Sequence, residues 1–229
     1  MEITLDTLGI DPEQAGLPRY IAVEGPIGVG KTTFAKRLAT TLSYGELLEQ
    51  AEENPFLERF YENRQANALP TQLYFLFQRT RQQKEWSQAE LFQPARVADY
   101  LLEKDSLFAS VTLDEEERRL YQMVYDQLTT DVPQPDLVIY LQASTEVLVE
   151  RVRHRGTVGE QNISSDYLAQ LNQAYADFFY YYDRAPLLIV NASEINLASN
   201  DEHYSDLVKY LLQIRWGTHY YNPHVERYI

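Results

Sequence analysis

The sequence predicts an α/β fold in which a five-stranded, mainly parallel sheet is flanked by helices. Five short runs typical of β-strands alternate along the chain with longer stretches of helical character. The first run and the last two are almost continuously apolar, as in strands that are buried on both faces. No internal repeat or low-complexity linker divides the 229 residues, a length within the range of one α/β domain. We therefore expect a single domain over residues 1–229.

The expected strands follow from apolar runs bounded by polar or turn-forming residues. The first, 19–25, leads directly into a glycine-rich stretch. Two shorter runs follow at 45–50 and 95–101. The last two, 136–143 and 186–192, carry the continuous apolar character of central strands.

Helical periodicity predicts seven helices between and after these strands. The second begins with Pro55 in its first turn, where proline is tolerated. The fourth opens on a run of acids, which suits the positive end of a helix dipole. In chain order the expected helices are 31–42, 54–66, 70–86, 114–128, 144–155, 165–183 and 201–216.

The composition of the chain indicates its cellular location and excludes some classes of binding partner. The chain has no cysteine, which excludes disulfides and thiolate metal sites and favours a reducing, cytoplasmic location. The first 20 residues have neither the basic nor the apolar region of a signal peptide, and no run approaches the ~20 apolar residues of a membrane span. A formal charge of -14 argues against a nucleic-acid partner, because such binding needs a basic face. Solubility is the simplest explanation of the acidity.

The glycine-rich stretch after the first strand predicts a phosphate-binding loop. Gly25, Gly30, Lys31 and Thr32 satisfy the pattern G-x-x-x-x-G-K-[ST], with an apolar strand before it and a helix after it. Glycines let the backbone turn its N–H groups toward a phosphate, and the helix N-terminus adds positive charge. Lys31 is expected on the β- and γ-phosphates of ATP, and the Thr32 hydroxyl on Mg²⁺. The expected ATP-binding residues are Gly25, Pro26, Ile27, Gly28, Val29, Gly30, Lys31, Thr32 and Thr33.

Two missing patterns and one cluster favour a small acceptor for the phosphate. The chain has no N-K-x-D run of a switch GTPase, and the acidic strand end of a motor ATPase occurs only in a weak form, at Asp99. Arg151, Arg153 and Arg155 stand within five residues of an otherwise acidic protein. A solvated basic face is the ordinary explanation of such a cluster. Taken together with the phosphate loop, however, the arginine cluster predicts an arginine-bearing lid at about 151–162 that closes over a transferring phosphoryl group. Arg151 and Arg155, four residues apart, are expected to lie on one helical face.

Acids near the end of the second strand are candidates for handling the acceptor. Glu49 lies where ligands bind in open α/β sheets, and its carboxylate would take or orient the proton of an attacking hydroxyl. Glu52 and Glu53 are rivals, and neighbouring acids are often merely solvated. Gln72 and Arg79 are seven residues apart, hence on one face of a helix rich in Phe, Leu and Tyr. A Gln amide suits a base edge, although two surface residues on an amphipathic helix are an equal alternative.

From about residue 19 to about 192 the sequence resembles the deoxyribonucleoside kinase family, particularly its bacterial deoxyadenosine/deoxyguanosine kinase branch. "LEQAEENPFLERFYEN" resembles the family segment in which Glu-Pro-Val ends the second strand, with Gln50 in place of the proline. The resemblance implies that Glu49 activates the sugar 5′-hydroxyl, that Tyr61 contacts the 3′-hydroxyl and that Gln72 and Arg79 lie near the base.

Two further segments extend the resemblance. "DYLLEKDSLFA" is similar to the family's acid-Arg-Ser segment, which implies Asp99 near Mg²⁺, Asp105 on the base and Phe108 stacked against it. "ERVRHRGTVGEQN" is similar to the family lid, which implies phosphate contacts for Arg151 and Arg155 and a contact of Glu160 with the 3′-hydroxyl that it shares with Tyr61. Family members are usually dimers joined through helices, and the segments 71–86 and 115–128 would supply such a seam.

One position departs from the family pattern. The arginine that follows the acid in the family is Tyr100 in this chain. The contacts that the family arginine makes with the 5′-hydroxyl and the phosphoryl group must then be made by another cation. Arg79, Arg153 and a shifted lid arginine are candidates.

The resulting prediction is a kinase that transfers the γ-phosphoryl group of ATP, with Mg²⁺, to the 5′-hydroxyl of a deoxyribonucleoside, with purines favoured. The catalytic set is Glu49, Lys31, Arg151 and Arg155. A nucleoside monophosphate kinase of the thymidylate type is an alternative, with Arg64 and Arg79 available on the acceptor side. A catalytically silent nucleotide-binding module is a third hypothesis, suggested by Tyr100.

Overall fold

The computed structural model describes residues 3–12, 16–89, 95–130, 132–157, 159–193, 197 and 200–222. Its centre is a parallel sheet in the order β2-β3-β1-β4-β5-β6. The strands are β1 (Tyr20–Glu24), β2 (Gly45–Leu47), β3 (Arg96–Ala98), β4 (Leu137–Gln142), β5 (Leu187–Asn191) and β6 (Thr218–Tyr221). All five neighbouring pairs run parallel, which confirms the predicted α/β class.

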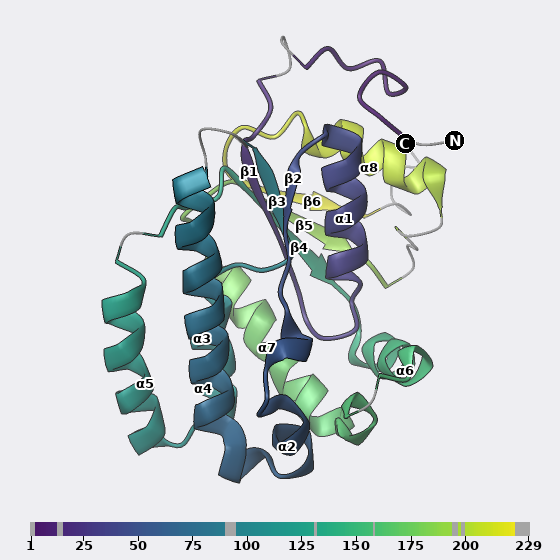
Figure 1. The fold of residues 1–229 in the computed structure, drawn as a ribbon. Helices are drawn as coiled ribbons and strands as arrows, with labels where there is room; N and C mark the ends of the chain where they lie inside the picture. The colour runs from purple at the N-terminus through teal and green to yellow at the C-terminus, as the bar shows by residue number, and fades with distance from the viewer. Residues whose placement is uncertain are drawn as a thin grey trace.

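The helices pass over both faces of this sheet (Figure 1). They are α1 (Lys31–Leu42), α2 (Leu57–Glu62), α3 (Arg64–Ala89), α4 (Lys104–Thr112), α5 (Glu115–Leu128), α6 (Thr145–Arg155), α7 (Ser165–Tyr180) and α8 (Asp201–Leu211). Two single 3₁₀ turns, η1 (Ala51–Glu53) and η2 (Glu160–Asn162), follow β2 and α6.

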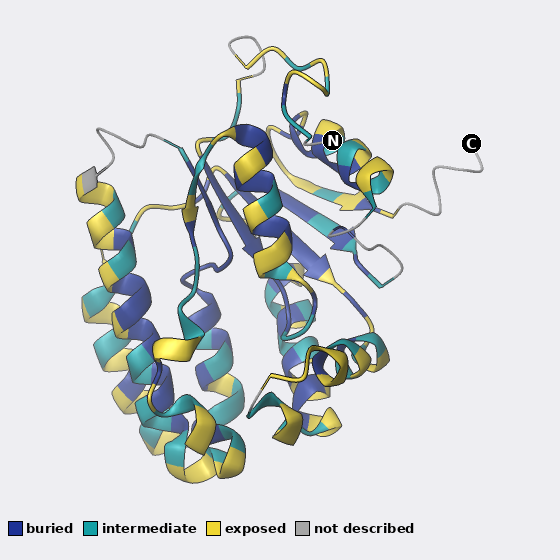
Figure 2. Cartoon of the chain, turned by 45° about the vertical axis from the view of Figure 1, so that its right-hand side comes forward, coloured by how far each residue is buried: buried dark blue, intermediate teal, exposed yellow. Residues whose placement is uncertain are grey.

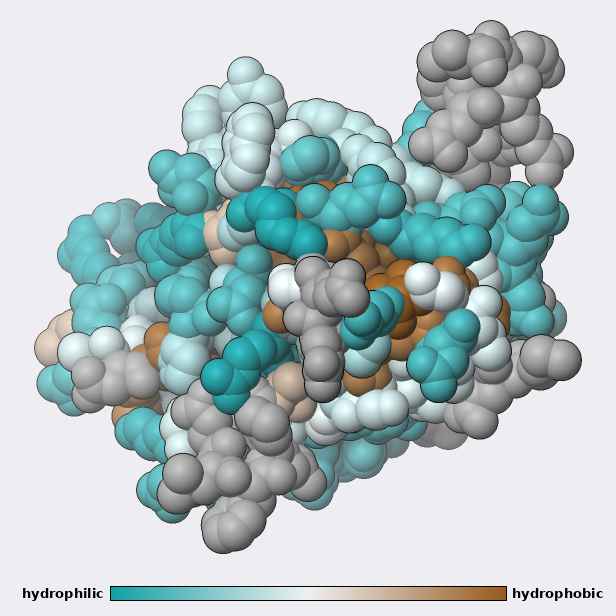
Figure 3. Space-filling view, turned by 90° about the horizontal axis from the view of Figure 1, so that it is seen from above, coloured by the Kyte–Doolittle hydropathy of each residue, from teal (hydrophilic) through white to brown (hydrophobic). Residues whose placement is uncertain are grey.

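Side-chain alternation along the central strands divides the core into two layers, because successive residues of a strand face opposite ways. Ile21 and Val23 pack with α1 and α8, whereas Tyr20 and Ala22 pack with α2, α3, α4, α5 and α7. Figure 2 shows the central strands largely buried and the helices buried on their inner sides. Seen from above, at the end where the strands begin, most side chains are hydrophilic, with an apolar area between them (Figure 3).

Local signals set most helix boundaries. Asp114 and Glu117 form a reciprocal capping box at the start of α5. The side chains of Ser144, Ser164 and Asn200 accept hydrogen bonds from the first turns of α6, α7 and α8. Gly156, with φ 64°, ends α6 inside the predicted lid.

Three predictions about the fold need correction. The described sheet has six strands rather than five, since 218–221 adds a parallel edge strand beside β5. Residues 104–112 form a helix, α4, that the sequence did not predict. Residues 54–66 are not one helix, because the chain turns at Asn63 and α3 begins at Arg64, six residues before Pro70. Asn63 Oδ1 accepts from the Ala66 N–H at 3.3 Å and so caps the longer helix.

No helix in the described part of the chain is long and apolar enough to cross a membrane.

Candidate active site

A cavity of about 1070 Å³ opens where the parallel strands end, beside the loop that follows β1. This is the edge at which open α/β sheets bind ligands. Its lining comes from the 25–30 loop and α1, the segment after β2, and helices α2, α3 and α4, with residues 155, 157 and 160 on the lid side. The volume is sufficient for a nucleotide-sized ligand.

The loop between β1 and α1 has the geometry of a phosphate cradle. Gly25 has φ 152° and Gly28 φ 86°, conformations that favour glycine. A Cβ on Gly25 would lie 2.4 Å from the Leu141 carbonyl oxygen, so no larger residue fits there. Lys31 begins α1, and its Nζ donates to the carbonyls of Gly25 at 2.7 Å and Pro26 at 3.2 Å.

Lys31 lies in an unusual electrostatic setting. Burial, followed by the charge of Lys104, lowers its pKa to about 8, against the opposing effect of Glu24, Glu49 and Asp99. The charges of three carboxylates and of a second lysine therefore act on its ammonium group.

Glu24, a buried carboxylate at the end of β1, ties the loop to its surroundings. Its oxygens accept from the N–H groups of Gly25 and Leu101 and from the Tyr175 hydroxyl, each at 2.9 Å. The loop is thereby joined to the segment after β3 and to α7. The sequence analysis did not single out Glu24; an acid directly before the first loop glycine was the available signal.

Asp99 follows β3 and connects the phosphate loop with the acceptor side. One carboxylate oxygen accepts from the Thr32 hydroxyl, and the other accepts from the Glu49 backbone N–H at 2.7 Å. Burial raises the pKa of Asp99, and the Thr32 hydrogen bond opposes that rise. A hydroxyl and a carboxylate side by side are the hard oxygen ligands that Mg²⁺ prefers, so this pair fits the predicted metal site. Among the described residues, no group of three or more acidic or histidine side chains forms a metal site of its own.

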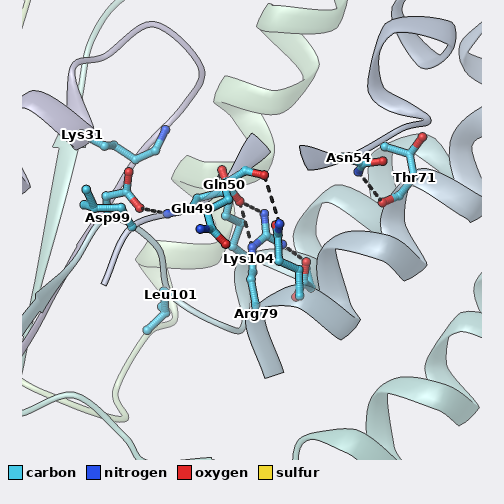
Figure 4. Close-up of polar contacts among 12 residues, drawn as sticks. Lys31, Glu49, Gln50, Asn54, Thr71, Arg79, Asp99, Leu101 and Lys104 are labelled. Carbon is cyan, nitrogen blue, oxygen red and sulfur yellow. Dashed lines mark hydrogen bonds and ion pairs between the residues drawn. The ribbon is translucent and has the colours of Figure 1, made fainter. Parts of the chain in front are cut away.

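Glu49 is held in place from two directions. Glutamines of α3 fix the segment around it: Gln78 Nε2 donates to the Gln50 carbonyl and Gln82 Nε2 to the Leu48 carbonyl, each at 3.1 Å. Figure 4 shows Gln50, Arg79 and Lys104 around Glu49. Gln50 stands where the family segment has proline, and these hydrogen bonds hold the backbone there instead.

Two cations contact the Glu49 carboxylate. Arg79 donates to Oε1, through Nε at 2.9 Å and through a second nitrogen, and Lys104 Nζ lies 3.2 Å from Oε2. Burial alone would raise the pKa of Glu49, but the charges of Arg79 and Lys104 outweigh it and hold that pKa well below its ordinary value. The group is therefore ionised at neutral pH and can accept a proton.

Arg79 links two acids, the half-buried Glu49 and the fully buried Asp105. Its guanidinium pairs with both carboxylates and is itself 3% exposed. Asp105 is fully buried and does not line the cavity. Its contact with the base, which the family resemblance implies, would thus run through Arg79 in this arrangement.

The opposite wall of the cavity carries the residues expected around the sugar and base. Tyr61 of α2 and Glu160 of η2 both line the cavity. Burial, followed by the Glu160 charge, raises the pKa of Tyr61 well above its usual range. Arg155 forms an ion pair with Glu160. Gln72 of α3, 2% exposed, and Phe108 of α4 also line the cavity.

Arg151 is placed differently from Arg155. Its guanidinium donates to the Ala192 carbonyl at 2.8 Å and, at 3.4 Å, to the carbonyls of Val29 and Ser193. It does not line the cavity in this structure, whereas Arg155 does. Residue 158, within the predicted lid, lies outside the described residues.

The structure thus brings Lys31, Thr32, Glu49, Tyr61, Gln72, Arg79, Asp99, Phe108, Arg155 and Glu160 to one cavity. Sequence reasoning missed Lys104, the buried partner of Glu49. Its signal was a lone lysine five residues after Asp99 in a segment whose family arginine is missing.

Together the fold and the cavity define a P-loop α/β protein that holds a paired carboxylate opposite its phosphate loop. The chain belongs to the deoxynucleoside kinase family, whose profile it matches over residues 21–214.

Two curated relatives are similar over most of the chain. Deoxyguanosine kinase of Bacillus subtilis (strain 168) is 37% identical over 158 residues, which cover 68% of this chain and 76% of that protein. Deoxyadenosine kinase of Dictyostelium discoideum is 32% identical over 183 residues, which cover 76% and 73%. Among solved structures, deoxyadenosine kinase from M. mycoides with bound dATP has a TM-score of 0.72 and 27% identity, and the match covers 83% of this chain and 99% of that one.

Proposed function

We propose that this protein is a kinase that transfers the γ-phosphoryl group of ATP to the 5′-hydroxyl of a deoxyribonucleoside. One observation carries the proposal: an ionised, doubly paired Glu49 lies across the cavity from the phosphate loop and its Lys31. A nucleoside between them would present its hydroxyl to the carboxylate and to the terminal phosphate at once.

In the reaction, the 5′ oxygen attacks the γ-phosphorus and forms a new P–O bond. The bond from that phosphorus to the β–γ bridging oxygen breaks, and its electron pair leaves with ADP. The hydroxyl proton passes to Glu49. Positioning and charge neutralisation supply most of the acceleration in this class of reaction.

Mg²⁺ would be held by ATP together with the Thr32 hydroxyl and Asp99. When bound, the ion neutralises charge on the phosphate oxygens. Asp99 also fixes Glu49 through its backbone N–H, so one residue would align the donor and acceptor sides.

The segment 151–162 would act as the lid of a single kinase domain spanning residues 1–229. Arg155 is the better placed of the two predicted arginines for phosphate, since it lines the cavity. Arg151, bonded to Val29 of the phosphate loop, would support that loop from behind until the lid closes. Tyr61 and Glu160 would share the sugar 3′-hydroxyl, which leaves little room for a 2′-hydroxyl.

Deoxyribonucleosides with a purine base are the favoured acceptors. Gln72 is buried at the cavity wall and offers an amide that pairs with a purine edge, and Phe108 offers a ring face. Relatives from Bacillus and Dictyostelium are named deoxyguanosine and deoxyadenosine kinases. A Bacillus relative, 27% identical, is named deoxyadenosine/deoxycytidine kinase, so deoxycytidine is included among the acceptors to be assayed.

ADP release is the test. The purified protein is mixed with ATP and Mg²⁺ and with each of four deoxynucleosides, four ribonucleosides and the matching deoxynucleoside monophosphates. We expect release with deoxyguanosine or deoxyadenosine, at least tenfold slower release with ribonucleosides, and none with monophosphates. Release with monophosphates alone would instead identify a monophosphate kinase, and no release with any acceptor would identify a silent binding module.

ATP binding should take up a proton at alkaline pH. Lys31 has a pKa of about 8, so above that pH much of the free protein carries it neutral, whereas phosphate favours the charged form. The terminal phosphate, with a second pKa near ~6, contributes little there. Calorimetry at pH 9 in buffers of different ionisation enthalpy should show uptake approaching one proton, with little at pH 6.5. Equal heats in all buffers at pH 9 would contradict the assigned role of Lys31.

We also propose that two copies associate through the outer faces of α3 and α5, which lie side by side (Figure 1). Phe77 of α3 and Leu120 and Met123 of α5 are large apolar side chains 49–66% exposed. Because one patch meets its own copy about a twofold axis, each contact between the copies occurs twice.

Met123→Glu should therefore separate the copies, since it places a charge at the centre of the seam. Light scattering after size exclusion should give twice 26.7 kDa for the unchanged protein and 26.7 kDa for the variant. Trp216→Glu, at an exposed aromatic residue outside both helices, is the control and should stay at the higher mass. A variant that keeps the higher mass would place the interface elsewhere.

We propose a cytoplasmic location, as the sequence predicts; cell fractionation with an antibody against the chain tests it.

A further inference from the structure

Lys104 is a buried lysine at the acceptor end of the cavity that the steps above leave without a role. It is the first residue of α4, and its side chain is only 4% exposed. A buried ammonium is costly unless it is paired, and lysine is rarely buried without a partner. The position therefore needs an explanation.

Its contacts place the ammonium beside the proposed proton acceptor. Nζ lies 3.2 Å from Glu49 Oε2 and 3.4 Å from Oε1, and 5.5 Å from the centre of the Phe108 ring. Lys104 also lines the cavity itself. A group bound between Glu49 and the phosphate loop would thus be within its reach.

Arg79, the other cation that contacts Glu49, already forms two ion pairs. It pairs with Glu49 and with the fully buried Asp105, so its role is to hold the carboxylate in position. Lys104 has three N–H donors, and within the described part of the chain its ion pair is with Glu49 alone. Since Nζ contacts both Glu49 oxygens, at least one donor remains for a ligand.

Two lysines from separate elements both line the cavity at this point. Lys31 approaches from the phosphate loop and Lys104 from α4, and the two ammonium groups are close enough that Lys104 contributes to the lowered pKa of Lys31. Glu49 and Asp99 lie in the same cluster (Figure 4). Two cations brought together from separate elements are stabilised when a negatively charged group binds between them.

Tyr100 does not fill this role. Its ring is fully buried, and its hydroxyl has no hydrogen-bond partner among the described residues. It does not line the cavity, and its ring centre lies 5.8 Å from the Arg79 guanidinium, on the core side.

We propose that Lys104 is a catalytic residue that contacts the transferring phosphoryl group and thereby supplies the positive charge that an arginine at position 100 would bring. This inference rests on the kinase function proposed above. In the phosphoryl-transfer step an N–H of Lys104 moves from sharing Glu49 to donating to a γ-phosphoryl oxygen, and no proton leaves the lysine. Meanwhile the 5′ oxygen bonds to the γ-phosphorus, the bond from that phosphorus to the β–γ bridging oxygen breaks with its electron pair leaving on ADP, and Glu49 takes the hydroxyl proton. The lysine so relieves Glu49 of a neighbour at the moment the carboxylate must accept a proton.

The chain contains no cysteine, so a charge can be removed and restored at this one site. In Lys104→Cys the ammonium is lost. Treatment with 2-bromoethylamine lets the introduced thiolate displace bromide and yields a lysine-like side chain with sulfur in place of one methylene. Treatment with iodoacetamide displaces iodide and yields a neutral amide of similar length. Lys84→Cys, at an exposed lysine of α3, is treated in the same way as the control.

We expect kcat for Lys104→Cys to fall about 10²–10³-fold, the usual loss when one preorganised donor to a developing charge is removed. The dissociation constant for the deoxynucleoside should stay within about threefold, which separates this role from substrate binding. The 2-bromoethylamine adduct should recover kcat to within about tenfold of the unchanged protein, and the iodoacetamide adduct should not. The Lys84→Cys protein should be unaffected by either reagent.

Glu49 keeps Arg79 in these variants, so the fold should persist, and thermal unfolding is measured first. Lys104→Met, which keeps the unbranched shape, is the second variant and should show the same loss of kcat. A kcat within threefold of the unchanged protein in either variant, or equal recovery by both adducts, would overturn the inference. An unchanged protein that phosphorylates no deoxynucleoside would instead overturn the proposed function itself, so the two failures are distinct.

Discussion

Glu49→Gln is expected to lower kcat for deoxynucleoside phosphorylation by about 10²–10⁴-fold, the range supplied by a positioned general base. The substitution keeps the size of the side chain and one oxygen that can accept from Arg79. It removes the negative charge and the ability to take the hydroxyl proton. ATP and the deoxynucleoside should still bind, because the phosphate loop and the Gln72 wall are unchanged.

Steady-state kinetics and calorimetric binding test this expectation together. Glu53→Gln is the matched control, because Glu53 was a rival acid in the sequence and its side chain instead accepts from Gln78 at 3.2 Å. That variant should keep kcat within about threefold. A near-normal kcat for Glu49→Gln, or a large loss in Glu53→Gln, would show that a different group handles the acceptor.

Arg79→Met is expected to be the most destabilising single change at the site. Arg79 is the only basic partner of Asp105 among the described residues, and the second oxygen of Asp105 has no hydrogen-bond partner there. Removing the guanidinium leaves a fully buried carboxylate uncompensated, which typically costs about 3–5 kcal/mol. For a chain of this length that corresponds to a fall in Tm of roughly 6–20 °C.

Thermal and denaturant unfolding measure the loss, and a second substitution tests its cause. Arg79→Met combined with Asp105→Asn removes the uncompensated charge and should restore about half of the lost stability or more. Activity should stay low in both proteins, since Glu49 loses the group that orients it. If the double variant is as unstable as the sum of the single ones, the two residues do not act as a pair.

Much of the fold was predictable because its signals are local. The apolar runs 136–143 and 186–192 contain β4 and β5, and the acids before 117 mark the start of α5. The sixth strand was not predictable in the same way. At the edge of the sheet Thr218 and Tyr220 are exposed, whereas His219 is half-buried and Tyr221 buried, so the pattern lacks the continuous apolar character of a central strand.

In the candidate site, too, residues with a local sequence signal were predictable, whereas residues that depend on contacts between distant segments were not. The spacing of Gly25, Gly30 and Lys31 requires a particular backbone geometry, and both glycines have the positive φ angles that it needs. Lys104 was missed because its role depends on a contact with Glu49, which lies 55 residues earlier in the chain. Pairs of that kind exist only after β2 and α4 are brought together by the sheet.

Arg151 and Arg155 illustrate the limit of spacing. Four residues apart, they were expected to share one helical face and one task. α6 ends at Arg155, so this side chain extends past the helix to Glu160, whereas Arg151 lies under the phosphate loop against Ala192. A helix end therefore separates two residues that the periodicity groups together.

The most direct test of the account is the chemical identity of the product. The protein is incubated with ATP, Mg²⁺ and deoxyguanosine, and the new phosphorus is observed by ³¹P NMR with proton coupling. We predict one phosphomonoester per ADP, coupled to the two protons of the 5′ carbon. A phosphoester on the 3′ oxygen, or inorganic phosphate in place of an ester, would contradict the placement of the sugar between Glu49 and the phosphate loop.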